Sequence, residues 1–149
     1  MGCACIQGEI MKPGNEERRE VEKIIHDCIG WALTKDLDRL FSIVAQDDDF
    51  FIFHPDSKST VIGFEAFKSL GERVWMKDAF KATDFAVRDL RLKFAEMGNA
   101  AWYSCFLDDH ALWNGQPTGW DNARWTGTLE KRNSKWVVVQ MHFSFPKDE

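Results

Sequence analysis

The sequence has little of several features that mark well-known protein classes. Its apolar runs are far shorter than the about 20 residues that span a bilayer, and its net charge of -5 comes with no Lys/Arg stripe. A phosphate backbone requires such a stripe, so nucleic acid is not expected as a partner. We therefore expect a soluble protein with no transmembrane segment, located in the cytoplasm.

The 4 cysteines of the chain show neither metal-ligand spacing nor the density of a disulfide scaffold. Cys28 and Cys105 lie in apolar patterns and are predicted to be small core residues. Cys3 lies in residues 1–14, a segment without periodicity that is predicted to be a flexible tail. A second interpretation is that Cys3 follows a missing signal peptide, which would make the chain a periplasmic lipoprotein.

Motifs for bound groups are also missing. We find no glycine-rich phosphate loop, no nucleophile elbow and no histidine pair at metal spacing. We therefore expect no cofactor and no metal.

Aromatic residues, in contrast, are abundant, with 7 Trp and 12 Phe against 1 Tyr. Tryptophan combines a large apolar area with one N–H donor, so it is well suited to wall a cavity or to anchor an interface. Bulky filling of the core is the simpler alternative.

The first half of the chain has the period of helices. Apolar residues recur every three or four positions up to about Leu33, again after Asp36, and again after Gly63. Between the last two segments, Phe50 to Phe53 is a short aromatic and β-branched run that predicts a strand.

From Lys81 onward the period is two, which predicts four strands joined by hairpins. The apolar phase changes near Arg88 and Asp89, so a β-bulge is expected there. Without crossover helices the strands should pair antiparallel, and the helices should cover one face. Residues 15–149 are thus predicted to form one α+β domain, with three N-terminal helices packed on a curved, mainly antiparallel sheet.

Several segments resemble SnoaL-like domains of the NTF2-like superfamily. They are Thr34–Asp38, Ile62–Phe67, Ala123–Leu129, Asn133–Trp136 and His142–Pro146. The resemblance implies a cone-shaped, cystatin-like fold, usually dimeric, with a cavity between sheet and helices. It is weak on function, because that superfamily holds isomerases, cyclases, dehydratases, epoxide hydrolases and kinase association domains.

Arg124 and His142 are the candidate catalytic residues, because a charge inside a strand must be paired or face water. If the loop at Asn133–Ser134 has an odd number of residues, both side chains share a face, and His142 could act as a general acid or base. The alternative is that this polar face is the outer side of the sheet and packs on a second subunit.

A cavity wall of aromatic residues is the second candidate feature, and His54 could line its mouth, although an exposed turn histidine is the alternative. The predicted substrate-binding residues are Trp31, Phe53, His54, Trp75, Trp102 and Trp120.

The run Asp108-Asp109-His110 could be mistaken for a metal cluster, but adjacent strand residues point to opposite faces. We interpret it as a strand-end turn. The superfamily's isomerases use a helix-borne Tyr with buried acids, whereas Trp31 stands near the end of the first helix here, and the pattern reveals no acid inside an apolar strand.

Two functions remain open. One is a small-molecule-binding protein, or a lyase, isomerase or hydrolase acting on a small apolar substrate. The other is a non-catalytic association domain that forms a homodimer through the sheet.

Overall fold

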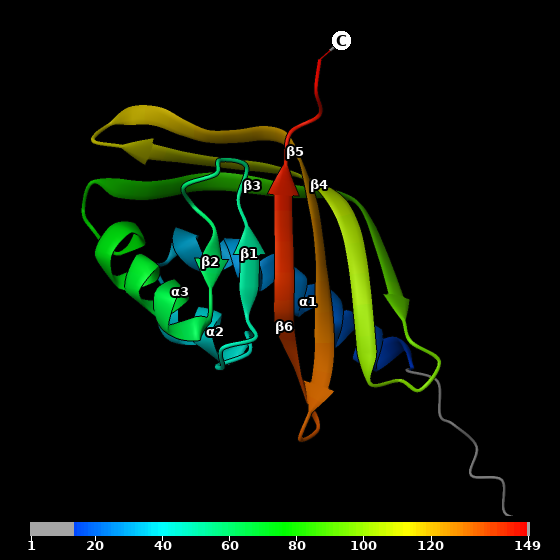
Figure 1. The fold of residues 1–149 in the computed structure, drawn as a ribbon. Helices are drawn as coiled ribbons and strands as arrows, with labels where there is room; N and C mark the ends of the chain where they lie inside the picture. Colours follow the sequence, from blue (N-terminus) through cyan, green and yellow to red (C-terminus); the bar gives the residue numbers. More distant parts are fainter. Residues whose placement is uncertain (1–13, 149) are drawn as a thin grey trace, which may run out of the picture.

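The computed structural model describes residues 14–148, which form one layer of helices on one six-stranded sheet (Figure 1). The predicted tail therefore lies almost wholly outside the described residues. The helical elements are α1 (Asn15–Gly30), η1 (Trp31–Leu33), α2 (Leu37–Ser42), α3 (Phe64–Leu70) and the π-helical turn η2 (Gly71–Trp75). The strands are β1 (Phe51–Phe53), β2 (Val61–Ile62), β3 (Phe80–Phe94), β4 (Ala100–Trp113), β5 (Gln116–Arg132) and β6 (Lys135–Ser144).

The helices form where the apolar period predicts them. In α1 the buried residues Val21, Ile24 and Ile25 recur at three and four positions and join the core. Asp36 caps α2, because its carboxylate accepts a hydrogen bond from the backbone N–H of Arg39 at 3.1 Å. Figure 1 shows α1 crossing one face of the sheet, with α2 and α3 beside it.

The strand order is β2-β1-β6-β5-β4-β3. All neighbours pair antiparallel except β1 and β6, which are parallel. The short strand β2 was not predicted. The prediction of three helices on a mainly antiparallel sheet is confirmed.

Bulges bend the long strands. The pairing of β3 with β4 shifts between Arg88 and Arg91, and Asp89 adopts a left-handed φ of 54°, so the predicted bulge is confirmed. A second shift between β4 and β5 falls between Leu107 and Asp109. In Figure 1 the C-terminal end of β4 and the N-terminal end of β5 bend over the molecule toward α3.

The hairpin of β5 and β6 does not follow the predicted relation between the number of loop residues and the faces of Arg124 and His142. Its turn holds two residues, Asn133 and Ser134, and an even turn alone would place Arg124 and His142 on opposite faces. The register shifts by one residue at Val139, however, so that Thr126 pairs with His142. The parity rule was therefore wrong for this hairpin, because it assumed an unbroken ladder.

The bulged hairpin places Arg124 and His142 on one face, which is the outer one. Both are exposed, while the alternating residues Trp125, Met141 and Phe143 are buried beneath the helices.

Among the helices that the structure describes, none is long and apolar enough to cross a membrane.

Candidate functional site

A cavity of about 570 Å³ lies between the helices and the bent ends of the strands. This volume is in the range of small-molecule sites. Helical residues such as Trp31 and Trp75 form one wall, and their rings lie 5.8 Å apart. Strand residues such as Ile52, Trp120 and Phe143 form the other wall. The cavity is thus largely apolar and aromatic, and Asp56, Lys58 and Arg73 add charged groups to its lining.

Asp109 is a carboxyl group on this apolar wall. It lies in β4 between Phe85 of β3 and Trp120 of β5, and its side chain is largely buried. Burial raises the pKa of Asp109 to about 6, because the charged form loses hydration. The neighbouring charge of His110 opposes this rise in pKa, and that of Asp84 adds to it. Asp109 can therefore exchange a proton near neutral pH.

Gly119 allows β5 to approach Asp109. A Cβ atom at Gly119 would lie 2.0 Å from the backbone oxygen of Asp109, and the residue has a φ of +118°. Only glycine meets both demands without strain. Gly119 also lines the cavity, so the close approach shapes the site directly.

His54 is the second titratable group with an unusual setting. Its Nδ1 lies 2.6 Å from the carbonyl oxygen of Ser59, and because a carbonyl only accepts, Nδ1 carries the hydrogen. Burial lowers the pKa of His54, which favours the neutral ring. The ring stacks on Phe143 at 5.6 Å and leans on Trp120 at 6.2 Å. Neutral His54 thus has a proton-accepting lone pair on Nε2.

Cys28 lines the same cavity, but its thiol does not exchange a proton near neutral pH as Asp109 can. Burial raises the pKa of its thiol to about 12, so the thiolate is scarce at neutral pH. The prediction that Cys28 and Cys105 are buried core residues is confirmed.

The chain is similar to a known family model and to solved structures. Residues 21–148 match the model of the SnoaL-like domain. The chain belongs to the SnoaL-like domain family. Sequence comparison found no relative among curated proteins.

Solved structures with the same fold include proteins of different roles. An NTF2-like protein of unknown function from Pseudomonas putida has a TM-score of 0.68 at 18% identity, covering 91% of this chain and 90% of that one. The association domain of C. elegans CaMKII has a TM-score of 0.65 at 15% identity, covering 87% and 96%. A candidate scytalone dehydratase from Novosphingobium aromaticivorans has a TM-score of 0.67 at 12% identity, covering 86% and 83%. These likenesses confirm the NTF2-like, cystatin-like fold.

In this SnoaL-like domain, four of the predicted substrate-binding residues line the cavity, and two do not. Trp31, His54, Trp75 and Trp120 line it. Trp102 is 49% exposed on the outer face of the sheet, because its neighbours in β4 take the buried positions.

The same alternation turns Phe53 outward, opposite Ile52 of the cavity wall, and leaves it 44% exposed. The sequence prediction of a cavity role for Phe53 and Trp102 is therefore not supported by their placement.

The candidate catalytic residues Arg124 and His142 also lie outside this cavity. Phe53 pairs with His142 across β1 and β6, and their rings are 5.3 Å apart on the outer face. Arg124 borders a separate open groove with Arg91 and Thr126 near the β3 bulge. Their placement fits the alternative in which the polar face is the outer side of the sheet.

Two sequence interpretations need correction. Asp108-Asp109-His110 is not a strand-end turn but lies within β4, and the inference that no acid stands inside an apolar strand missed Asp109. Asp109 is flanked by two polar residues that face outward, so the local pattern looks like a polar turn. The signal that could have found it is the alternation of Tyr103, Cys105 and Leu107, which continues to Asp109.

Proposed function

We propose that this SnoaL-like domain binds a small, mainly apolar molecule in the cavity and moves a proton on it with Asp109. The observation that carries the proposal is the Asp109 carboxyl group, with a pKa of about 6, on a strand wall that it shares with Ile52, Trp120 and Phe143. Perturbed acids in apolar cavities are typical of proton-transfer sites. Lyase or isomerase chemistry on a carbonyl compound fits this arrangement best.

The proposed chemistry needs only groups that line the cavity. Ionised Asp109 takes a proton from the carbon next to a carbonyl group, which leaves an enolate. Protonated Asp109 then returns this proton to a different carbon, which isomerises the substrate, or gives it to a departing hydroxyl group, which eliminates water. His54 accepts a hydrogen bond at Nε2 and orients a substrate hydroxyl, because its Nδ1 is held by Ser59. The rings of Trp31 and Trp75 hold the apolar body.

Exchange of substrate protons with D2O tests this proposal. Small cyclic ketones and enones serve as probes, with binding followed by tryptophan fluorescence and exchange by NMR. We expect Asp109→Asn to keep binding and to lose exchange by about 10²-fold or more. The matched control is Asp49→Asn, which changes an exposed acid in a turn outside the cavity lining. Wild-type exchange in Asp109→Asn, or no saturable binding of any probe, would refute the proposal.

A homodimer formed through the sheet remains the second proposal, and the outer face supports it. Ile62, Phe53 and Trp102 are exposed there at 69%, 44% and 49%. Apolar side chains gathered on one face are typical of association surfaces. The kinase association domain among the solved structures with this fold points the same way.

Sedimentation equilibrium separates the two proposals. If the sheet face associates, Trp102→Ser and His142→Ala weaken the dimer while Asp109→Asn leaves it unchanged. A wild-type chain that sediments as a monomer at all concentrations overturns the homodimer.

A further inference from the structure

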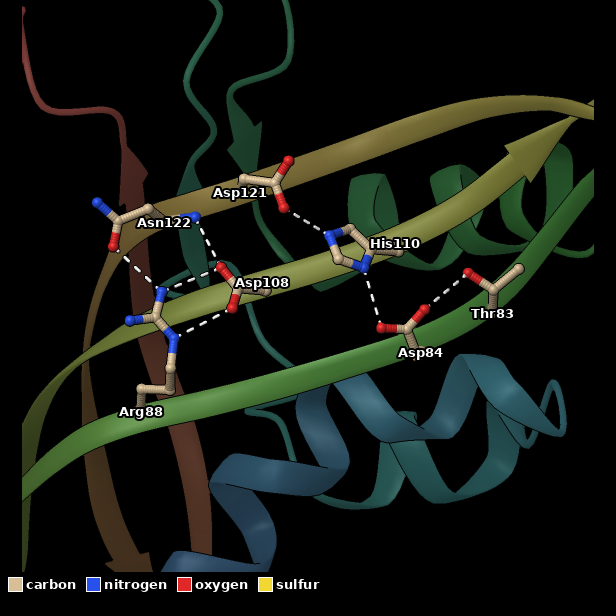
Figure 2. Close-up of polar contacts among 7 residues, drawn as sticks. All are labelled: Thr83, Asp84, Arg88, Asp108, His110, Asp121 and Asn122. Atoms are coloured by element: carbon tan, nitrogen blue, oxygen red, sulfur yellow. Dashed lines mark hydrogen bonds and ion pairs between the residues drawn. The ribbon is translucent and has the colours of Figure 1, made fainter.

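Asp108 and His110, which flank Asp109 in β4, both form hydrogen bonds to the neighbouring strands β3 and β5. Asp108 and His110 follow the alternation of β4 and therefore point to the outer face, opposite the cavity (Figure 2). Each of them contacts one residue of β3 and one of β5. The residue between them is Asp109, the proposed proton-transfer group.

The His110 network is the more symmetrical of the two. Nδ1 lies 2.9 Å from the Asp84 carboxylate on β3, and Nε2 lies 2.6 Å from the Asp121 carboxylate on β5. Both nitrogens can donate only when the ring is protonated. The hydrogen bonds to Asp121 and Asp84 raise the pKa of His110 to about 9, so the ring is a cation at neutral pH. Thr83 in turn contacts Asp84 at 3.2 Å.

The Asp108 network mirrors this arrangement two residues earlier in β4. Its carboxylate accepts two hydrogen bonds from the Arg88 guanidinium, at 3.0 and 3.1 Å, and one from the backbone N–H of Asn122 at 2.8 Å. Arg88 also donates to the Asn122 side chain at 3.1 Å. Figure 2 shows both networks crossing the same three strands.

The pairing of β4 with β5 is interrupted at the point where these hydrogen bonds lie. The β4–β5 register shifts between Leu107 and Asp109, so Asp108 has no residue directly opposite it in β5. Asn122 adopts a left-handed φ of 54° beside the shift. A bulged strand can rotate its side chains away from the regular alternation. The hydrogen bonds from both neighbours of Asp109 to β3 and β5 oppose such a rotation.

We propose that Asp108 and His110 are positioning residues, which hold the Asp109 carboxyl in the cavity from the opposite face of the sheet. The inference rests on the proposed function of Asp109, and it concerns how that carboxyl is held rather than what it binds. Precise placement has large kinetic value, because a displacement of about 1 Å at a reacting group can cost about 10²-fold in rate.

NMR measures the placement of Asp109 without any ligand. Three-bond couplings to the carboxyl carbon report whether the side chain holds one χ1 rotamer. We expect one rotamer in the wild type and averaged couplings in His110→Phe. His110→Arg keeps a cation with donors for Asp84 and Asp121, so we expect it to restore the single rotamer.

Control variants separate positioning from general loss of stability. Arg132→Met removes a comparable network, in which Arg132 bonds Asp47 and Glu130 away from the cavity, and should leave the Asp109 couplings unchanged. If His110→Phe does not fold, Arg88→Met releases Asp108 instead and is read in the same way. Unchanged couplings in both variants overturn the proposal, as does averaging in His110→Arg equal to that in His110→Phe.

A pH titration provides the second readout. The charged groups that shift the pKa of Asp109 are His110 on its own strand and Asp84 on β3, and Asp56, Lys58 and Arg73 line the same cavity from the β1–β2 loop and η2. His110→Phe removes the nearby cation, so the midpoint of Asp109 should rise above about 6, whereas His110→Arg should keep it. With a probe that exchanges protons, His110→Phe should lose on the order of tenfold in kcat with KM unchanged. If Asp109→Asn retains exchange, the proposed function fails while the NMR result stands on its own.

Discussion

Asp108 and Asp109 are chemically identical neighbours in β4, yet the sheet gives them opposite acid–base properties. Asp108 faces outward, where hydrogen bonds from Arg88 and from the Asn122 backbone hold its pKa below the ordinary value. Asp109 faces the cavity, where burial raises its pKa to about 6. The face of the sheet, rather than the residue type, decides which acid can transfer a proton near neutral pH.

The largest expected effect comes from a substitution at Gly119, where β5 passes close to the backbone of Asp109. Gly119→Ala would place a Cβ 2.0 Å from the Asp109 carbonyl oxygen at a φ of +118°, so β5 must move away. We expect a loss of about 3 kcal/mol in the free energy of unfolding, measured by urea denaturation.

Gly115→Ala is the matched control for this prediction. Gly115 also has a positive φ, of +79°, but a Cβ there would meet nothing within 4 Å. Its substitution should cost only about 1 kcal/mol of backbone strain. Equal losses in the two variants would show that the close approach to Asp109 does not matter.

A smaller effect follows from removing the buried charge of Asp109. The pKa of Asp109 is higher in the folded chain than in the unfolded chain, so its contribution to stability is complete below about pH 4 and is lost as the pH rises through about 6. With allowance for water in the open cavity, this loss is about 2 kcal/mol. Asp109→Asn should remove that decline.

Urea denaturation at several values between about pH 4 and pH 7 measures this effect. The stability of Asp109→Asn relative to the wild type should increase as the pH rises. A difference that stays constant with pH would mean that Asp109 is not buried as a charge in solution.

The fold was predictable because it depends on periodicity that extends over many residues. The change of period at Lys81 and the phase change at Arg88 and Asp89 predicted the sheet and its bulge. The bulge at Val139 was not predictable in the same way. Val139 and its neighbours Val137 and Val138 are all apolar, so the sequence shows no change of phase where the register shifts.

The site was harder to predict than the fold, because it depends on the facing of single residues. Composition and fold alone predict that aromatic residues on helices, such as Trp31 and Trp75, line the cavity, and both line it. Trp102 was assigned by the same reasoning, but strand alternation turns it outward. Asp109 was missed because its neighbours are polar for a different reason, their contacts on the outer face.

The smallest expected effect comes from Asp108, and its sign is opposite to that of Asp109. The folded pKa of Asp108 is lowered, so its contribution to stability is present above about pH 4 and is lost as the pH falls through the folded pKa. Asp108→Asn should therefore lower the melting temperature at pH 7, by roughly 2 °C or less because the pair with Arg88 is exposed to solvent. The difference from the wild type should shrink as the pH falls toward about 3. Thermal melts at both pH values measure it, with the exposed Asp49→Asn as control. A difference that grows on acidification would mean that the Arg88 pair does not stabilise the ionised form of Asp108, and the contrast with Asp109 would then rest on burial alone.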